Sequence, residues 1–381
     1  DLHRRRHSFP TRRSSDLFCQ TLPAPEGSRG LLVAFSGGLD SSSVICAMAN
    51  INRSSPATTQ KDWQHAFVAS FPGTFLDETK YARLVTNYLG IKAHFLEIDP
   101  LKTLNDLFYQ TYLFEELFYA PVIPFVQLYA NIRRNGVVVS IDGHGADELF
   151  AGYPFDMNAA LIDSLPYPRR FNNVLLAINN ASGLPATADR FNKLKYAIAS
   201  RYSLARMLAS NTASAVKKPN MDYLNSVLFH SAFKNILPTL LRNYDRYSMI
   251  NGVEIRMPFL DYRIVEFAFA IPGSSKVRGG FGKAIVRDAL KGLVPDAILF
   301  RKDKIGFNPP IHAWMNEQMK DWIGDLVHSV DFNNCTLIDR KATFEKINRA
   351  LKSGQTEFVE GVKLFELLSP VIWEKSLSYA K

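Results

Sequence analysis

The sequence predicts an α/β fold, in which a parallel sheet is followed by a mostly helical C-terminal half. Two observations lead to this prediction. Between residues 31 and 141, short apolar runs alternate with stretches of helical periodicity, as in the crossover units of parallel sheets. After Tyr153 the alternation typical of strands fades, and helical periodicity dominates to the end. The 381 residues, 47% of them hydrophobic, suffice for one large domain or two ordinary ones.

The strands and the first helices can be placed in order along the chain. Four strands are expected, at Leu31–Phe35, Trp63–Ser70, Ala93–Ile98 and Val137–Ile141. A helix over Ser41–Ala49 follows the first strand, and Pro100–Arg134 is mostly helical. Prolines mark loops between residues 160 and 220.

The helix between the second and third strands has the clearest pattern. Its apolar face, with the spacing i, i+3, i+4, i+7, consists of Tyr81, Leu84, Val85 and Tyr88. Asp77 and Glu78 are expected in its first turn, and Gly90 follows its end. These start and stop signals predict an amphipathic helix over this segment.

The composition argues against several classes of protein. No run of about 18 apolar residues is present, so no transmembrane helix and no membrane partner are expected. The net charge is +9, but no Lys/Arg run within the expected fold indicates a nucleic-acid surface, so a basic enzyme with anionic substrates is favoured. Cys19, Cys46 and Cys335 are far apart, which favours a reducing, cytoplasmic location over a disulfide framework.

The first 17 residues are excluded from the fold prediction. They are arginine-rich and lack the apolar core of a secretory signal. The stretch "HSFPTRRSSDL", His7–Leu17, resembles the translated reading frame of a common sequencing adapter, so our hypothesis is that residues 1–17 are non-native. The native gene would then continue upstream of Phe18, and an N-terminal domain could be missing.

One Gly-rich turn follows the first strand, in "LLVAFSGGLDSSSV". Glycines let the backbone approach an anion closely, and the N-terminus of the next helix favours negative charge. Ser36, Ser41 and Ser42 add hydroxyl donors, and Asp40 adds a carboxylate suited to Mg²⁺. A tight β–α turn with capping serines is the alternative, but the combination favours a phosphate site.

This turn lacks the Gly-Lys-Ser/Thr of a Walker loop and the Gly-x-Gly-x-x-Gly dinucleotide pattern. "SGGLDSS" resembles the pyrophosphate loop of the ATP-pyrophosphatase superfamily, whose members cleave ATP between its α and β phosphates. The resemblance implies that the loop holds pyrophosphate as the leaving group and that Asp40 holds its Mg²⁺.

A second cluster, "SIDGHGADELFAGY", follows the fourth strand. Gly143 and Gly145 flank His144, and the acids Asp147 and Glu148 come next. Acids that merely cap a helix are the alternative. Since the carboxyl ends of parallel strands meet at one edge, the two Gly-rich loops are expected to share one Mg²⁺–ATP.

Four stretches together resemble the synthetase domain of the asparagine synthetase family, which also contains β-lactam synthetases and lasso-peptide cyclases. They are "FSGGLDSS", "SIDGHGADELFAGY", "LRNYDRYSMINGVEIRMPFLD" and "RKDKIGFNPPIHAW". The resemblance implies a sheet of the adenine-nucleotide alpha-hydrolase, or pyrophosphate-loop, type. It implies an ATP-binding α/β part at residues 18–154 and a helical part of the same domain at residues 155–381. The glutaminase half of glutamine-dependent members is not recognisable in this sequence.

The resemblance also implies roles for individual residues. The nucleotide-binding positions are Ser36, Gly37, Gly38, Asp40, Ser41, Ser42 and Gly143. Asp40 and Asp147 would hold Mg²⁺, and Lys304 would stabilise charge during adenylylation or acyl transfer. Asp245, with Arg246, Glu254 and Arg256, falls in the substrate-side segment. Lys304 could instead be a surface lysine, and Glu254 and Arg256 could form a structural ion pair.

Two departures from the family pattern concern the acceptor. Asparagine-forming members carry Glu where this chain has His144, and β-lactam synthetases carry Tyr there. A histidine could serve as a general base toward an amine, or it could contact a different carboxylate. The segment around residues 154–219 is longer than expected, and it could be a surface insertion or could shape a site for a glycan or peptide.

The sequence therefore predicts an ATP- and Mg²⁺-dependent, AMP-forming carbon–nitrogen ligase of asparagine biosynthesis. It would adenylylate a carboxylate, aspartate by default, and transfer ammonia, supplied free or by a glutaminase domain. The alternatives are intramolecular amide formation, as in β-lactam synthetases or macrocyclases, and amidation of a glycan or peptide carboxylate. A transfer-RNA-modifying ligase and a non-catalytic nucleotide carrier are less compatible with the motifs, and a homodimer is compatible with them.

Overall fold

The computed structural model describes residues 31–54, 63–104, 107–117, 123–181, 220–302 and 308–380. Within these ranges, five strands form one parallel sheet in the order β3-β2-β1-β4-β5. The strands are β1 (Leu31–Ala34), β2 (Gln64–Ser70), β3 (Lys92–Glu97), β4 (Val139–Ile141) and β5 (Glu254–Arg256). The prediction of an α/β fold with a parallel sheet is confirmed, and the first four strands lie where they were expected.

The fifth strand was not predicted. β5 lies in the part expected to be helical and pairs with β4 in parallel, with Ser140 opposite Ile255. Helical periodicity was expected to dominate this half of the chain, and β5 is a short exception to it. Three residues are too few to display the alternation by which a strand is recognised, and β5 depends on its partner strand.

The chain changes its direction of winding at the centre of the sheet. From β1 it adds β2 and β3 on one side, and it then returns to place β4 and β5 on the other side of β1. In such sheets the loops after the two central strands diverge and leave a crevice at their carboxyl ends. Both Gly-rich loops of the sequence leave the sheet at this point.

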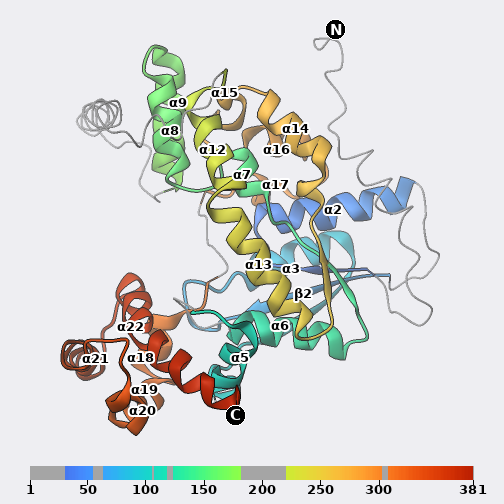
Figure 1. Cartoon of the computed structure of the whole chain (residues 1–381). Helices are drawn as coiled ribbons and strands as arrows, with labels where there is room; N and C mark the ends of the chain where they lie inside the picture. Colours follow the sequence, from blue (N-terminus) through green and yellow to red (C-terminus); the bar gives the residue numbers. More distant parts are fainter. Residues whose placement is uncertain are drawn as a thin grey trace.

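Helices cover both faces of the sheet (Figure 1). In β2, Ala66 and Val68 pack on one side against α2 (Leu39–Ser54) and α3 (Thr79–Leu89). Phe67 and Ala69 belong to the opposite core, together with α6 (Ile123–Arg134). The period-2 alternation of β2 therefore joins two hydrophobic cores.

The amphipathic helix α3 agrees with its prediction in part. Gly90 ends the helix in the left-handed region at φ 68°, as its position suggests. The helix begins at Thr79, so Asp77 and Glu78 precede it and do not lie in its first turn. Val85 is fully buried, whereas Tyr88 is 50% exposed, because the buried face is centred on Ala82 and Val85.

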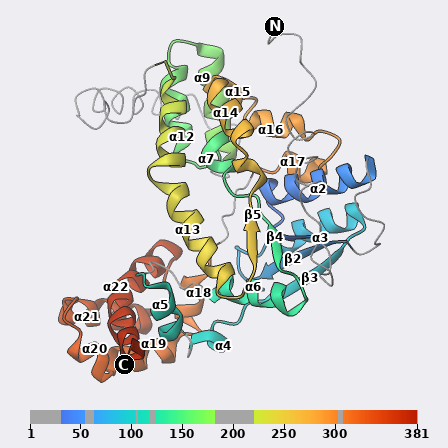
Figure 2. The ribbon, with the colours of Figure 1, turned by 45° about the vertical axis from the view of Figure 1, so that its right-hand side comes forward.

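The C-terminal half is mostly helical, as predicted. Helices α18 (Ile311–Asn316), α19 (Lys320–His328), α20 (Val330–Asn334), α21 (Arg340–Ser353) and α22 (Phe358–Ser376) gather beside α5 (Leu107–Phe114), as both views show (Figures 1 and 2). They share the hydrophobic core that also contains α6. The 3-10 helix η2 (Leu377–Ala380) follows, and α4 (Leu101–Leu104) precedes α5.

A third hydrophobic cluster joins three further helices. It contains buried residues of α8 (Asp156–Ser164), α9 (Pro168–Ala181) and α12 (Tyr223–Phe233). The remaining elements are α7 (Ala146–Phe150), α13 (Ile236–Met249), η1 (Pro258–Leu260), α14 (Tyr262–Ala270), α15 (Gly273–Lys276), α16 (Ala284–Ala289) and α17 (Asp296–Leu299). Only part of the predicted insertion, up to residue 181, lies among the described residues, and that part is helical.

Two expectations about the environment of the chain can be compared with the described residues. None of the helices among them is long and apolar enough to cross a bilayer. Cys46 and Cys335 are buried and unbonded, in line with the expectation of no disulfide framework between them. Cys19 lies outside the described residues.

Candidate active site

A cavity of about 490 Å³ lies at the carboxyl edge of the sheet, where the winding changes direction. Its walls include the loop after β1 and the loop after β4, so the structure brings the two predicted motifs together. Ser36, Gly38, Asp40 and Ser41 line it from the first motif. Gly143, His144, Asp147 and Glu148 line it from the second.

The loop after β1 has a shape that requires glycine. Gly37 has φ 80°, and a Cβ there would lie 2.6 Å from the backbone nitrogen of Ala82. Gly38 N–H donates to Ser36 Oγ over 3.1 Å, and the hydroxyl oxygens of Ser36 and Ser41 are 3.2 Å apart. The turn is therefore tight, and it leads directly into the N-terminus of the 16-residue helix α2.

Two predicted nucleotide-binding residues do not line the cavity. Ser42 is fully buried, and its hydroxyl has no hydrogen-bond partner in the structure. Gly37 is also absent from the cavity wall, so its contribution is the shape of the turn. Gly143 does line the cavity, and a Cβ there would lie 2.7 Å from the backbone of Asp40. Glycine at position 143 therefore lets the two loops touch.

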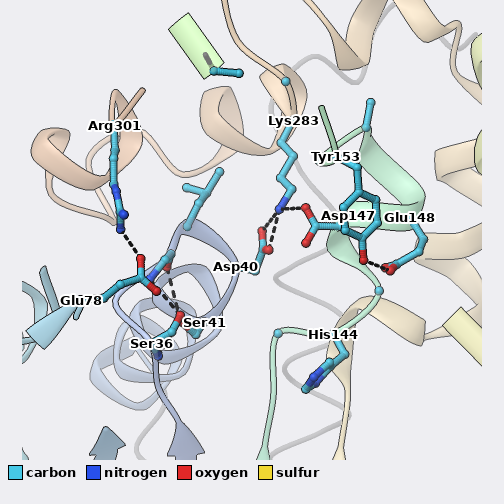
Figure 3. A pocket seen from close by; sticks show the side chains of 18 of the residues that line it. Ser36, Asp40, Ser41, Glu78, His144, Asp147, Glu148, Tyr153, Lys283 and Arg301 are labelled. Carbon is cyan, nitrogen blue, oxygen red and sulfur yellow. Dashed lines mark hydrogen bonds and ion pairs between the residues drawn. The ribbon is translucent and has the colours of Figure 1, made fainter. Parts of the chain in front are cut away.

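Lys283 links the two carboxylates that were predicted to hold Mg²⁺. Its Nζ lies 2.5 Å from Asp40 Oδ2 and 2.6 Å from Asp147 Oδ1 (Figure 3). Burial alone would lower the pKa of Lys283, but the two carboxylates outweigh it and raise the pKa above its usual value. Lys283 therefore carries a positive charge at neutral pH.

The backbone around Lys283 is adapted to this position. Lys283 precedes α16 in the left-handed region at φ 52°, a conformation that costs a non-glycine residue about 1–2 kcal/mol. At Gly152, a Cβ would lie 1.6 Å from Asp147 Oδ1 and 2.4 Å from Cε of Lys283. The site thus combines backbone strain with a close approach that only glycine permits.

Sequence reasoning missed Lys283. The signal was present in "GGFGKA", where three glycines precede a lysine at a helix start. In the structure, Gly279 and Gly280 have positive φ, and a Cβ on Gly282 would lie 2.5 Å from the Ala151 carbonyl oxygen. A glycine-rich turn that delivers a lysine to a helix N-terminus is a pattern of phosphate sites.

Further cations face the same cavity. Arg287, Arg301 and Lys302 line it. Arg301 Nη1 donates to Glu78 Oε1 over 2.6 Å, and both side chains are nearly inaccessible (Figure 3). The Arg301 guanidinium also lies 3.8 Å from the ring centroid of Tyr81. This packing orients one cation rigidly beside the Gly-Ser loop.

His144 lines the cavity near a group of buried aromatic and polar side chains. The centroid of its ring is 4.0 Å from that of Tyr244 on α13, and its Nδ1 is 3.8 Å from Asp142 Oδ2. Burial lowers the pKa of His144, although nearby carboxylates oppose the shift. The imidazole is therefore mainly neutral at neutral pH and can accept a proton.

Glu148 and Tyr153 form a second polar pair on the cavity wall. Tyr153 Oη donates to Glu148 Oε1 over 2.5 Å (Figure 3). Burial raises the pKa of the Glu148 carboxyl, and burial together with Glu148 and Asp147 raises the pKa of Tyr153. Tyr153 thus keeps its proton and fixes the Glu148 side chain.

The substrate-side residues of the sequence prediction lie elsewhere. Asp245 is exposed on α13, outside the cavity wall, while its neighbour Tyr244 lines the cavity. Arg246 binds Glu116 and the Phe114 carbonyl. Lys304 lies outside the described residues.

The remaining substrate-side residues belong to β5 and bind each other. Arg256 Nε lies 2.6 Å from Glu254 Oε1, so the two side chains form an ion pair. Neither residue lines the cavity. The structure therefore agrees with the alternative in which this pair is structural.

The donor set suits Mg²⁺ that arrives with a nucleotide. Among the described residues, no group of three or more His, Cys, Asp or Glu side chains is placed to hold a metal alone. Asp40 and Asp147, however, converge on a single point, the Nζ of Lys283. Mg²⁺ typically uses one or two protein carboxylates and completes its shell with phosphates and water.

Comparison with known proteins agrees with this site. The family model described as "Asparagine synthase" matches residues 27–372. Asparagine synthetase [glutamine-hydrolyzing] 3 of Bacillus subtilis is 30% identical over 55% of this chain and 32% of its own length. Asparagine synthetase [glutamine-hydrolyzing] 1 of the same organism is 25% identical, over 77% of this chain and 48% of its own length.

A protein with a different name also matches. Amidase chyE of Penicillium rubens is 24% identical over 84% of this chain and 55% of its own length. The chain thus spans between 32% and 55% of the length of these three relatives. Since the family model covers most of its residues, the chain belongs to the asparagine synthase family.

Proposed function

We propose that this chain is an ATP-dependent, AMP-forming ligase that converts a carboxylate into an amide. The observation that carries the proposal is the meeting of Asp40 and Asp147 at one lysine ammonium, beside a Gly-Ser loop and a helix N-terminus. This arrangement suits a nucleotide triphosphate whose β and γ phosphates must leave as pyrophosphate. The sheet is proposed to be of the adenine-nucleotide alpha-hydrolase type, with the ATP-binding part at residues 18–154.

Each group on the cavity wall has a task in this reaction. The backbone of Gly38 and the hydroxyls of Ser36 and Ser41 would bind the departing phosphates. Asp40 and Asp147 would hold Mg²⁺, which neutralises phosphate charge when bound. The positively charged ammonium of Lys283 would exchange its carboxylate partners for a phosphate oxygen. Lys304 would stabilise charge at the reacting phosphorus, as the sequence predicts.

The acceptor end of the cavity is proposed to lie at His144 and Tyr244. Ammonia would attack the acyl carbon of the adenylate, the bond from carbon to the phosphate oxygen would break, and AMP would leave. His144 is mainly neutral and would take the proton that the nitrogen loses. The default carboxylate is aspartate, because two relatives are named asparagine synthetase, and ammonia would come free or from a glutaminase domain.

A larger or intramolecular acceptor is the second candidate. Met157 of α8 and Ala177 and Ala181 of α9, all in the predicted insertion, line the cavity. Two relatives named amidases, chyE and chry2, match 84% and 85% of this chain. These observations favour a carboxylate other than aspartate, such as one carried by a peptide or glycan.

The test follows AMP, pyrophosphate and amide together, with ATP, Mg²⁺, ammonium and either aspartate or a panel of other carboxylic acids. Asparagine formed in step with AMP supports the leading proposal. Carboxylate-dependent AMP from another acid supports the second candidate. No carboxylate-dependent release of pyrophosphate with any acid contradicts both.

A further inference from the structure

A buried carboxylate lies directly behind the proposed base. Asp142 is 1% exposed and follows β4, two residues before His144. Its Oδ1 accepts a hydrogen bond from Ser140 Oγ over 2.6 Å, and its Oδ2 accepts one from Tyr129 Oη over 2.8 Å. Its backbone N–H donates to the carbonyl of Arg256 on β5 over 2.8 Å. Asp142 is thus held from three elements.

The side-chain donors to Asp142 named above are two hydroxyl groups, which are neutral. Burial and the neighbouring carboxylate raise the pKa of Tyr129 well above its usual value, so its hydroxyl keeps the proton that it donates. A buried carboxylate is stabilised further by a positively polarised N–H or a cation. The distance from Asp142 Oδ2 to His144 Nδ1 is 3.8 Å, which is within ion-pair range but longer than a hydrogen bond.

The two nitrogens of His144 are in different environments. Nδ1 is buried and has no hydrogen-bond partner among the described residues, whereas the side chain as a whole remains 20% exposed. The exposed part therefore includes the Nε2 edge. Tyr244 packs against the ring at an interplanar angle of 60° and limits its rotation.

We propose that Asp142 is a positioning residue that holds the His144 imidazole with its hydrogen on Nδ1, so that Nε2 faces the cavity as the proton acceptor. This inference rests on the proposed function for its catalytic meaning. The amine nitrogen forms the new bond to the acyl carbon, AMP departs with the electrons of the broken C–O bond, and the proton goes to Nε2. The positive imidazole that results is stabilised by Asp142.

The pKa of His144 also depends on other charged groups. Asp40 on α2 and Asp147 on α7 contribute at longer range, and Lys283 lies between these two. Only Asp142 faces Nδ1 within ion-pair distance among the described residues. A free imidazole prefers the hydrogen on Nε2, so a hydrogen on Nδ1 would be a direct sign of the Asp142 interaction.

The first experiment reads the tautomer in the ligand-free protein. Histidine labelled with ¹⁵N and ¹³C is incorporated, the His144 signals are assigned by their loss in His144→Gln, and the ring nitrogens are identified near pH 7.5. The hydrogen is expected on Nδ1 in the wild type and largely on Nε2 in Asp142→Asn. Hydrogen on Nε2 in the wild type overturns the proposal, and this reading stands even if the variant fails to fold.

The second experiment measures the step that the tautomer serves. With ATP, Mg²⁺, aspartate and ammonium chloride, Asp142→Asn is expected to keep the first-turnover release of pyrophosphate within a few-fold and to lose amide formation about 100-fold. Asp325→Asn, on the exposed side of α19, is the matched control. Equal amide formation in Asp142→Asn and wild type overturns the positioning role.

The two measurements separate the proposal from the proposed function. If the wild type releases no AMP with aspartate, the assay is repeated with the acid that supports release. If no acid supports release, the proposed function fails, while the tautomer still decides whether Asp142 holds His144.

Discussion

At the scale of single residues, the site depends on a few charges held at close quarters. The buried Lys283 compensates two half-buried carboxylates, and Arg301 packs between Glu78 and Tyr81. Breaking a buried pair by removing one partner is costly, because a charge is left uncompensated. Each of these cations therefore matters for both the fold and the ligand.

Lys283→Met is expected to reduce ATP-dependent pyrophosphate release by about 100-fold or more, because a charge aimed at the leaving group is lost. The measurement is the rate of pyrophosphate release at saturating Mg²⁺–ATP. Lys291→Met is the control, since Lys291 is 59% exposed and, among the described residues, pairs only with surface Asp288. Lys283→Arg, which keeps the charge, separates loss of charge from loss of folding. An unchanged rate in Lys283→Met would remove this residue from the mechanism.

At the scale of elements, the loops work because of what their glycines allow. The turn into α2 presses against α3, and the Gly143 loop presses against Asp40. The helix N-terminus and the two carboxylates that are proposed to hold Mg²⁺ then lie within one cavity. A change that widens either loop is expected to affect nucleotide binding before it affects the fold.

Gly37→Ala tests the turn, and Gly73→Ala is its matched control. Both glycines have positive φ, 80° and 76°, so both variants bear about 1–2 kcal/mol of backbone strain. Only at Gly37 would the new methyl group meet backbone atoms, at 2.6 Å, since the space at Gly73 is open. Urea unfolding should show the strain in both variants, and ATP affinity should fall at least tenfold in Gly37→Ala alone. Equal ATP affinities would show that the turn tolerates a side chain.

Helix α15 ends with a fully buried lysine outside the site. Lys276 Nζ donates to Asn225 Oδ1 over 2.6 Å, and burial lowers its pKa to about 7, opposed by Asp222 and Asp156. Between pH 7 and its usual value of 10.5, the unfolded chain binds a proton that the folded chain lacks. The free energy of unfolding therefore rises with pH across this window.

The expected slope from Lys276 is about 1.4 kcal/mol per pH unit at most. Urea unfolding at pH 7.0, 7.75 and 8.5 measures it, and Lys276→Met should lose this contribution relative to the wild type. Comparing the two proteins cancels the other titrating groups. Parallel pH profiles would mean that Lys276 stays charged when buried.

Sequence reasoning found the acidic residues and the histidine of the site but missed the lysine that binds the two acids. Asp40, Asp147 and His144 stand in contiguous motifs, and the parallel sheet brings them together as expected. Lys283 could not be assigned from spacing, because its position depends on a left-handed backbone and on contacts with residues far away in sequence. Strand β5 was missed for a similar reason, since it is specified by β4 and not by its own three residues.

At the scale of the whole molecule, the cavity lies where several parts of the fold come together. Its walls come from the edge of the sheet, from α8 and α9, from α13, and from the turn before α16. These parts belong to different hydrophobic clusters. A ligand that fills the cavity therefore binds several parts of the fold at once and stabilises them together.

Mg²⁺–ATP is expected to raise the melting temperature, whereas Mg²⁺ alone should change it little, because Lys283 already compensates both carboxylates. Ligand at 100 times its Kd stabilises by about 2.7 kcal/mol. Thermal unfolding with ATP plus Mg²⁺, ATP plus EDTA, and Mg²⁺ alone provides the comparison. Asp147→Asn should lose the Mg²⁺-dependent part, and Asp325→Asn should retain it. A large shift with Mg²⁺ alone would contradict the proposed joint binding.

The position of β5 has a consequence for how the protein is made. Asp40 and Asp147 leave the ribosome first, the strand that pairs with β4 follows more than a hundred residues after Asp147, and Lys283 follows that strand. During synthesis, Asp40 and Asp147 therefore emerge before Lys283, which compensates their charge. At that stage the edge of the sheet at β4 is also unpaired. A nascent chain arrested before residue 254 should hence need chaperone protection, and this need should end only after β5, Lys283 and the C-terminal helices that complete the core have emerged.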